Sequence, residues 1–500
     1  MILEINGNIS RYYAESLVLL FFPGSKFPEN PTQDCDNIKV TMSVWEHNGT
    51  ASGSVCISGE NDVVEASYTV PIDVACRKSG EMLCKIAVGG AMLDAGGKFT
   101  GACPPWGMLT GVRPAKMALE IINRGHTEDE AAKMLCGDFL CKASKAHLAA
   151  STASVESVYI TDKARGECSV YIAIPFCPSK CSYCSFVSFT SEKLLSLIPE
   201  YLIYLCDDIK NIFELIEKVG KRVSTVYIGG GTPTVLSENQ LEILLSCISN
   251  CIDVSTLDEF TLEAGRPDTI TEEKLDVAKK HGVTRISVNT QTLNNNILAA
   301  IGRHHTSDDF FDAYDMAKKS GIRDINVDLI AGLPGESSES FAASLDKVIE
   351  LDPTNITVHT FYAKRAAEVV KKNNEIYRIQ DIETQKAVEY SQRALISAGY
   401  RPYYMYRQKN TTANLENVGY AKPGHEGIYN IMMMEEIHTV FGAGASAMTK
   451  LVAPHEDNMK IIRICETKYP YEYLDNHKST AQEEKRDNLW EQTEDFYSKF

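Results

Sequence analysis

Positive charge and long hydrophobic runs are both scarce in this sequence. Its 500 residues hold 50 Lys and Arg against 67 Asp and Glu, a formal net charge of −17, and no Lys/Arg-rich stripe follows the chain. A nucleic-acid partner is therefore not expected, because such stripes neutralise phosphates. The apolar run over residues 14–23 is too short to span a bilayer, and no basic, apolar and cleavable leader opens the sequence. We expect a cytoplasmic protein without a membrane span.

A disulfide framework is also not expected, although the sequence has 15 Cys. All but three of them are scattered, mostly singly, which suits a reducing compartment. With 44% apolar residues and room for about three domains, the chain can bury large cores.

The three exceptions are Cys177, Cys181 and Cys184, which directly follow the apolar run 170–174. A structural zinc site takes four Cys or His ligands, and no fourth Cys or His occurs within the next twenty residues. An iron–sulfur cluster fits the count better, because a 4Fe-4S cube held by three thiolates keeps one iron open for a small chelating ligand. An iron without a protein ligand indicates that the cluster takes part in a reaction and does not only store electrons.

From Gly166 onward, strand-like and helix-like segments alternate strictly, which predicts a parallel sheet with crossover helices. Helix starts support this division, because Ser237 with Gln240 and Thr269 with Glu272 have capping-box spacing. Six such units predict an α/β fold with a partial (β/α)6 barrel and ligands at the carboxyl ends of the strands. The expected strands are 168–174, 224–228, 259–263, 284–289, 323–330 and 355–361.

Glycine or polar residues come at the ends of several of these strands. The glycine run 229–231 follows the second strand, where absent side chains let backbone approach a ligand. Glu263 ends the third strand, and a carboxylate buried there without a cation is costly. Gln291 and Arg303 follow the fourth strand, and Asp328 ends the fifth. An amide, a guanidinium and a carboxylate at one edge suit the hydroxyl and carboxylate groups of a ligand.

The spacing Cys-x3-Cys-x2-Cys, with Tyr183 before the last Cys, resembles the radical S-adenosylmethionine (SAM) superfamily. The resemblance implies that Cys177, Cys181 and Cys184 bind a 4Fe-4S cluster whose open iron takes the amino and carboxylate groups of SAM. It also implies that one electron cleaves SAM to methionine and a 5′-deoxyadenosyl radical. These cysteines are therefore the predicted metal ligands and the predicted catalytic centre.

Residues 169–364 resemble one branch, the oxygen-independent coproporphyrinogen III oxidase family, which includes coproporphyrinogen dehydrogenases and haem chaperones. Two positions depart from the family pattern: Ala173 stands where the family has His, and Phe186 stands where the oxidases carry a fourth, non-ligating Cys. The resemblance implies a SAM-binding set composed of Tyr171, Tyr183, Gly230, Gly231, Thr232, Glu263, Gln291, Arg303, Asp328, Ile330 and Ala363.

Segments outside the barrel resemble the HemZ-type subgroup of that family. They are an extension of some 165 residues ahead of the cysteines and motifs at 105–114, 406–409, 417–420 and 423–427, together with 263–267 inside the barrel. The subgroup implies an oxidoreductase of porphyrin and haem biosynthesis. It would convert two propionates of coproporphyrinogen III to vinyl groups with loss of carbon dioxide, giving protoporphyrinogen IX.

The resemblance also implies partners for this chain. They are the tetrapyrrole substrate and a reduced flavodoxin- or ferredoxin-type electron donor, and the expected state is a monomer. Anionic propionates need cationic side chains. The candidates are Arg266, Lys364, Arg365, Arg407 and Lys409.

Three other functions stay open on the same scaffold. A haem chaperone of the family would share the cysteines and the SAM residues, and His304 and His305 are candidate axial ligands for haem. A radical SAM methyltransferase or a haem-degrading enzyme would share them too.

Four domains are expected along the chain. Residues 1–100 predict a small α/β domain, with strands at 1–9, 40–45 and 52–57, a hairpin turn at Asn48–Gly49, and helices at 12–22 and 78–93, the last stopped by Gly96–Gly97. Residues 101–165 predict a helical connector and 166–370 the radical SAM barrel. Residues 371–500 predict an α+β domain that covers the barrel mouth and ends in a docking helix with Trp490 and Phe496.

Overall fold

The computed structural model describes residues 1–28, 38–47, 49–71, 80–111, 113–185, 188–362, 374–408, 414–453 and 460–500. The chain divides into two units. The first unit comprises residues 1–154, 362–385 and 405–416, and the second comprises 155–361, 386–404 and 417–500. No helix in the described ranges is long and apolar enough to cross a membrane.

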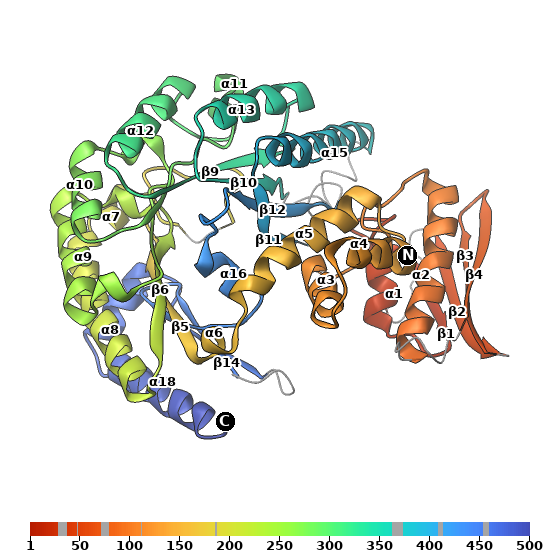
Figure 1. Ribbon diagram of the computed structural model, residues 1–500, viewed down its shortest axis with the longest axis horizontal. Coiled ribbons are helices and arrows are strands. Elements are labelled where there is room, and N and C mark those ends of the chain that lie inside the picture. The colour runs from red at the N-terminus through yellow and green to blue at the C-terminus, as the bar shows by residue number, and fades with distance from the viewer. Residues whose placement is uncertain are drawn as a thin grey trace. The chain divides into compact units, whose positions relative to one another are not determined.

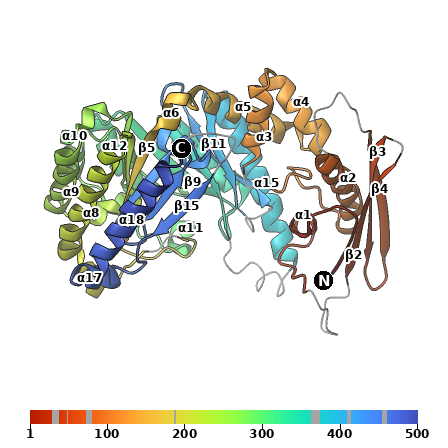
Figure 2. The same ribbon diagram turned by 90° about the horizontal axis from the view of Figure 1, so that it is seen from below.

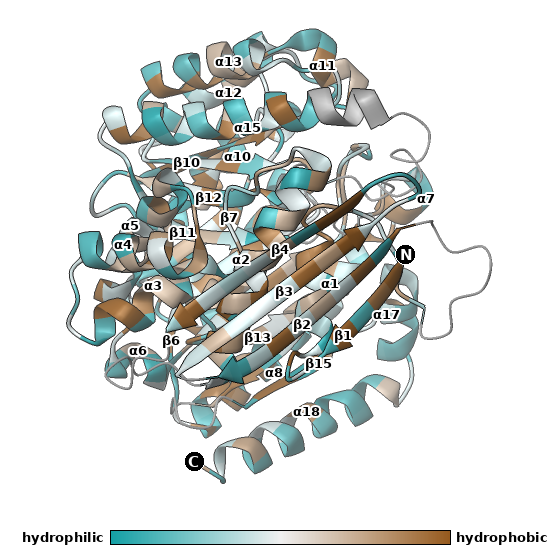
Figure 3. Ribbon diagram, turned by 90° about the vertical axis from the view of Figure 1, so that its right-hand side faces the viewer, coloured by the Kyte–Doolittle hydropathy of each residue, from teal (hydrophilic) through white to brown (hydrophobic). Residues whose placement is uncertain are grey.

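A four-stranded sheet forms the amino-terminal part of the first unit (Figure 3). Its strands lie in the order β1 (Ile2–Asn6), β2 (Lys39–His47), β3 (Thr50–Ser58) and β4 (Val63–Pro71). Helix α1 (Arg11–Val18) follows β1, and α2 (Gly80–Thr100) packs on the sheet. A Cβ at Gly53 would lie 2.6 Å from the carbonyl carbon of Ala87, so this glycine lets α2 approach β3 closely.

The expected strands and helices of this region are confirmed, with two corrections. Strand β4 was not predicted, and α2 does not stop at the glycine pair but continues to Thr100. A Cβ at Gly96 would lie 2.7 Å from the Phe21 ring, so tertiary packing keeps a glycine inside the helix. Of the predicted hairpin turn, Asn48 lies outside the described residues, and Gly49 has a φ of 75°.

The connector region contains α3 (Pro114–Asn123), α4 (Glu128–Phe139) and α5 (Ala143–Tyr159), and the short α6 (Asp162–Gly166) follows within the second unit. The core of the first unit holds a buried ion pair between Lys145 and Glu416. Trp106 Nε1 also donates to Glu416 at 2.8 Å. The buried Arg407 donates to the carbonyl oxygen of Leu109. These contacts bind the 105–114 motif to residues 405–416.

The second unit contains the predicted barrel sheet. Its six parallel strands are β5 (Glu167–Ile174), β6 (Arg222–Gly230), β7 (Glu259–Glu263), β8 (Arg285–Ser287), β9 (Asp324–Ala331) and β10 (Asn355–Thr360). All six expected strands are thus confirmed to within a few residues. Buried residues dominate most of them, as expected for parallel strands covered on both faces.

Crossover helices line the outside of this sheet (Figure 1). They are α7 (Glu192–Leu195), α8 (Ile198–Lys218), α9 (Glu238–Cys251), α10 (Glu272–Lys280), α11 (Asn295–Ala300), α12 (Ser307–Lys319) and α13 (Ser338–Glu350). The capping box of Ser237 and Gln240 is confirmed at α9. The box expected at Thr269 is wrong, because α10 begins after Thr271 and Thr269 lies in the turn η3 (Pro267–Thr269).

The carboxyl-terminal residues do not form a further unit beyond residue 370, because they extend the barrel sheet at both ends. Strand β12 (Glu416–Ala421) pairs with β10, next to β11 (Arg401–Arg407). Strand β13 (Thr439–Ala443) pairs with β5 and continues into β14 (Met448–Val452) and β15 (Ile461–Cys465). The chain thereby satisfies backbone groups that would otherwise be open at the barrel edges.

Four more helices belong to this part of the chain, namely α15 (Asn374–Ser397), α16 (Ile428–Met434), α17 (Pro470–His477) and α18 (Ala481–Tyr497). The expected docking helix is confirmed as α18, beside α8 (Figure 2). Arg486 Nη2 donates to Asp208 of α8 at 2.8 Å, and Trp490 Nε1 donates to Asn211 at 3.1 Å. Phe496 is buried.

Because the Lys145–Glu416 ion pair is buried, we expect that removing one partner lowers the free energy of unfolding strongly. Glu416→Gln should lower the free energy of unfolding by about 3–5 kcal/mol, because it leaves a buried ammonium without its counter-charge. The double variant Lys145→Met/Glu416→Gln should recover most of that loss. Denaturant unfolding at pH 7 measures both values.

Asp94→Asn, which removes the exposed ion pair with Lys98, is the matched control and should cost less than about 1 kcal/mol. A Glu416→Gln variant no less stable than this control would contradict the assignment of the buried pair.

Candidate active site

The three cysteines lie on the loop that leaves the carboxyl end of β5. Cys177 and Cys181 are buried and Cys184 is half-buried. Two backbone hydrogen bonds join the start of the loop to its end: Cys177 N donates to Phe189 O at 3.1 Å, and Phe189 N donates to Pro175 O at 2.9 Å. Ser182 N donates to Ile301 O at 3.0 Å, which ties the loop to the segment after α11.

The glycine run after β6 lies against this cysteine loop. Gly231 N donates to Ile174 O and Thr232 N donates to Phe176 O, each at 2.8 Å. A Cβ at Gly231 would lie 2.4 Å from Phe176 O, so only glycine fits there. Thr232 Oγ1 lies 3.3 Å from the Sγ atom of Cys177. The run therefore brings backbone close to the cysteine loop itself.

Glu263 ends β7 beside a group of stacked tyrosines. Its carboxylate accepts a hydrogen bond from Tyr227 Oη at 2.5 Å. The Tyr227 ring stacks on Tyr429 of α16 with centroids 4.4 Å apart, and Tyr171 stacks on Tyr227 at 6.1 Å. Burial is the main cause that raises the pKa of Glu263 to about 7, and the nearby charge of Asp328 acts in the same direction, whereas the Tyr227 hydrogen bond and the charge of His359 oppose the rise. At Glu263 the effect of burial therefore outweighs that of its favourable neighbours.

Asp328 on β9 is in the opposite electrostatic state. Asn326 Nδ2 donates to its Oδ1 at 2.7 Å, and His359 Nε2 lies 3.7 Å from its Oδ2. Burial alone would raise the pKa of Asp328, but the hydrogen bond and positive charge of His359 hold it below its usual range. Burial likewise opposes the charged form of His359, yet Asp328 raises the pKa of this imidazole. The two side chains form a coupled acid–base pair.

His359 was not singled out from the sequence. It lies on β10, one residue before the strand ends at Thr360. The rule that functional residues lie at the carboxyl ends of parallel strands would have found it, because the same rule selected Glu263 and Asp328.

Gln291 contributes through its backbone. It is buried with a φ of 71°, which is uncommon for a residue other than glycine. Its N donates to Asp328 O and its O accepts from Ile330 N, both at 3.0 Å, so the segment after β8 is fixed against β9. Ile330 itself packs in an apolar cluster with Ile297, Ile301 and Leu333, and Tyr183 lies against that cluster.

Two buried arginines lie beside the cysteine loop. Arg303 donates to Tyr183 Oη from Nε at 3.1 Å and from Nη2 at 2.8 Å, and its Nη1 donates to the carbonyl of Gly265 at 3.0 Å. Arg266 Nη1 lies 3.6 Å from the Sγ atom of Cys181. Arg266 is one of the predicted propionate-binding candidates, but in the structure its guanidinium contacts the cysteine loop.

A hollow of about 200 Å³ opens beside the loop. Ala173 lines this hollow, and its small side chain leaves space where the resembled family has a His. The full lining is Tyr171, Ala173, Pro175, Ser185, Gly230, Ala445 and Ser446. The structure therefore brings Tyr171 and Gly230 of the predicted SAM set to one cavity next to the cysteines.

The other predicted residues fall into three groups. Ala363, Lys364, Arg365 and Lys409 lie outside the described residues. His304 is exposed whereas His305 is buried, so the two neighbours face different environments and do not form a joint ligand pair. Arg407 belongs to the first unit, where backbone carbonyls accept its hydrogen bonds.

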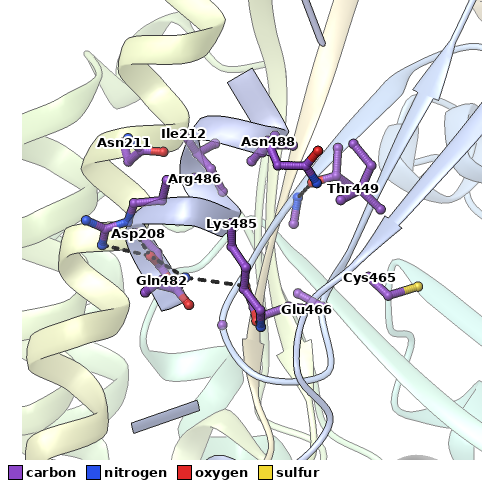
Figure 4. Close-up of a pocket in the computed structure, with 15 residues that line it drawn as sticks. Asp208, Asn211, Ile212, Thr449, Cys465, Glu466, Gln482, Lys485, Arg486 and Asn488 are labelled. Atoms are coloured by element: carbon purple, nitrogen blue, oxygen red, sulfur yellow. Dashed lines mark hydrogen bonds and ion pairs between the residues drawn. The ribbon is translucent and has the colours of Figure 1, made fainter. Parts of the chain in front are cut away.

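A second pocket lies between α8, α18 and strands β13–β15 (Figure 4). Asp208 accepts hydrogen bonds from Arg486 at 2.8 Å and from Gln482 at 3.3 Å, and Lys485 pairs with Glu466. The charged groups of this pocket are thus matched to one another and hold α18 in place. Its lining residues include none of the predicted site residues.

Comparisons with known proteins identify the family. Residues 171–348 match the radical SAM superfamily. The oxygen-independent coproporphyrinogen-III oxidase-like protein HemZ of Bacillus subtilis (strain 168) is 38% identical over 377 residues, which cover 75% of this chain and 75% of that protein. The chain belongs to the radical SAM family of coproporphyrinogen oxidase-like proteins.

Two further proteins are similar to this chain. The heme chaperone HemW of Bacillus subtilis (strain 168) is 30% identical to this radical SAM protein over 328 residues, covering 64% of the chain and 82% of HemW. The solved structure of coproporphyrinogen III oxidase (HemN) from Escherichia coli, a radical SAM enzyme, matches with a TM-score of 0.45 and 20% identity, covering 68% of this chain and 84% of that one.

The cofactors of this radical SAM protein are a 4Fe-4S cluster and SAM. The cysteine loop fits such a cluster in its donor chemistry, with three thiols on one loop and the Arg266 cation beside Cys181. Burial raises the pKa of the Cys177 thiol, so iron must displace its proton on binding. Within the described ranges, no three Cys, His, Asp or Glu side chains are gathered as a metal centre. The assignment of the three cysteines as ligands therefore stays a prediction.

Glu263 predicts a pH-dependent stability of the ligand-free protein. Its pKa rises from 4.5 to about 7, so the folded chain holds a proton that the unfolded chain releases, and stability falls as pH rises through that window. Glu263→Gln, which keeps an acceptor for Tyr227, should raise the free energy of unfolding by roughly 2–3 kcal/mol at pH 8. At pH 4.5 the gain should be small. Denaturant unfolding at both pH values tests this.

Glu120→Gln on the exposed face of α3 is the control, and its effect should not change with pH. Equal stabilisation by Glu263→Gln at both pH values would contradict the raised pKa.

Proposed function

We propose that this protein is an oxygen-independent coproporphyrinogen III oxidase, a radical SAM enzyme of porphyrin biosynthesis. The observation that carries the proposal is the similarity to the HemZ protein, whose name describes it as oxidase-like. This similarity covers 377 residues, whereas the superfamily match covers the 178 residues 171–348, so it extends beyond the radical SAM segment. Cys177, Cys181 and Cys184 would hold the cluster. When bound, the cluster supplies the electron that cleaves SAM.

The proposed reaction has a simple balance. One hydrogen atom leaves the propionate β-carbon and goes to the 5′-deoxyadenosyl group. The bond to the carboxylate breaks, carbon dioxide leaves, and a vinyl group forms. One electron remains and goes to an electron acceptor. Two such rounds convert coproporphyrinogen III to protoporphyrinogen IX.

The residues at the strand ends would bind and shield SAM. Glu263 has a buried carboxyl group whose neighbours do not offset the cost of its charge, which suits the positive charge of SAM, and His359 favours the ionised form of Asp328, which suits hydroxyl donors. The stacked rings of Tyr171, Tyr227 and Tyr429 form a flat apolar wall beside Glu263, which would keep water away from a reactive intermediate. Arg303 is already bonded to Tyr183 and would meet SAM through that hydroxyl or by exchanging it.

Haem delivery is the second candidate function. It is favoured by the likeness to the heme chaperone HemW, which is 30% identical and covered over 82% of its length. A chaperone would bind haem without oxidising a precursor, so product analysis separates the two functions.

The cluster assignment is tested by counting iron and sulfide after anaerobic reconstitution of the full chain. The wild type should bind about four iron and four sulfide per chain, and the variant Cys177→Ala/Cys181→Ala/Cys184→Ala should bind almost none. Cys103→Ala, at an exposed cysteine of the first unit, is the matched control and should keep the wild-type content. Stoichiometric zinc without iron in the wild type would overturn the assignment.

The substrate assignment is tested with coproporphyrinogen III deuterated at the propionate β-carbons. Reduced, cluster-replete protein with SAM should pass deuterium into 5′-deoxyadenosine, and products with one and then two vinyl groups should appear in order. Product masses and label are read by mass spectrometry. Tight haem binding with no label transfer and no decarboxylated product would support the chaperone and overturn the oxidase.

A further inference from the structure

Arg266 is a buried cation in direct contact with the cysteine loop. It lies on the turn after β7 and is 3% exposed. Its Nη1 donates to Sγ of Cys181 at 3.6 Å and to the carbonyl of Ser179 at 3.3 Å, and its Nε donates to Asp268 at 3.2 Å. The Arg266 guanidinium therefore contacts both the backbone and a thiol of the cysteine loop.

The turn that carries Arg266 is itself fixed by polar contacts. Thr269 Oγ1 donates to Arg266 O at 2.8 Å and lies 2.7 Å from Thr234 Oγ1. Lys274 Nζ donates to the carbonyls of Thr234 and Thr269 at 2.7 and 3.0 Å. These hydrogen bonds join the turns after β6 and β7. They fix the backbone that carries the Arg266 side chain.

This guanidinium has donor capacity left over. Its Nη2 is buried and has no hydrogen-bond partner in the part of the chain that the structure describes. Buried donors without partners are unfavourable and rare. Arg303 differs, because each of its three nitrogens donates to a neighbouring group. The spare Nη2 donor belongs to the same guanidinium group as Nη1, which contacts Cys181, so a sulfur-rich ligand at that thiol would bring acceptors near it.

We propose that Arg266 is a positioning residue for the cluster, one that holds Cys181 and donates N–H hydrogen bonds to cluster sulfur. The proposal rests on the proposed function, because it takes Cys181 as a cluster ligand. One-electron reduction adds a negative charge to a cluster that already carries three thiolates. A buried cation and hydrogen bonds to sulfur stabilise the more negative state, so Arg266 raises the reduction potential.

The test compares three full-length variants after anaerobic reconstitution, without SAM. Arg266→Gln removes the charge, and Arg266→Lys keeps the charge but loses the planar fork. Arg222→Gln is the matched control, because it removes an arginine at the start of β6 that pairs with Glu167 and Asp258. Iron and sulfide are counted first, and the midpoint potential is then measured by a redox titration followed by electron paramagnetic resonance.

Arg266→Gln should make reduction at least tenfold less favourable, a midpoint about 59 mV lower for one electron. Arg266→Lys should shift the midpoint in the same direction by a smaller amount, and Arg222→Gln should match the wild type. A full cluster with the wild-type midpoint in Arg266→Gln overturns the proposal, and so does an equal shift in Arg222→Gln.

If Arg266→Gln does not fold by circular dichroism, Arg266→Lys decides. Electron nuclear double resonance of its reduced cluster should lack exchangeable-proton couplings that the wild type has, and unchanged couplings with an unchanged midpoint overturn the proposal. Wild-type protein without iron overturns the proposed function itself, and the iron count shows this before any potential is measured.

Discussion

The hydrogen bonds between the end of β5 and the turn after β6 hold the site together. Gly231 and Thr232 donate their backbone N–H groups to the carbonyls of Ile174 and Phe176, so the first residues of the cysteine loop continue the sheet pairing beyond the strands. This pairing brings the backbone so close that a side chain at Gly231 is excluded. The contacts of the loop with Ile301 and Arg266 come later along the chain, after this hydrogen-bonded segment.

Two carboxylates on neighbouring parts of this edge differ in their electrostatic environment. Asp328 has an imidazole and an amide beside it, and these partners offset the cost of burying its charge. Glu263 has a phenol, a second carboxylate and, with the smallest effect, the same imidazole near it, and together these do not offset its burial. Burial therefore favours the protonated form of Glu263, and the ionised form of Asp328 persists beside it, so the two carboxyl groups differ in charge near neutral pH.

The sequence predicted the six barrel strands because short strand-like segments alternate strictly with helix-like segments from Gly166 onward. It predicted the strand-end residues because parallel topology collects them at one edge. It failed at β4, which lies at a sheet edge with a single buried residue, Ala66. It also failed at the Gly96 position, where contact with Phe21 overrides the local helix-stop signal. His359 was missed because the strand-end rule selected residues after the first five strands and not on β10, and its role comes from its position 3.7 Å from Asp328.

The pairing of β5 with β13 has a consequence for synthesis. Thr439 lies opposite Cys168, so the strand that leads into the cysteine loop gains its outer neighbour only when residues near 440 have emerged from the ribosome. Tyr429, which closes the stack over Tyr171, arrives equally late. Until then one edge of β5 is open to water and to other chains. The nascent protein therefore completes the surroundings of its cysteines only after most of the barrel has been made.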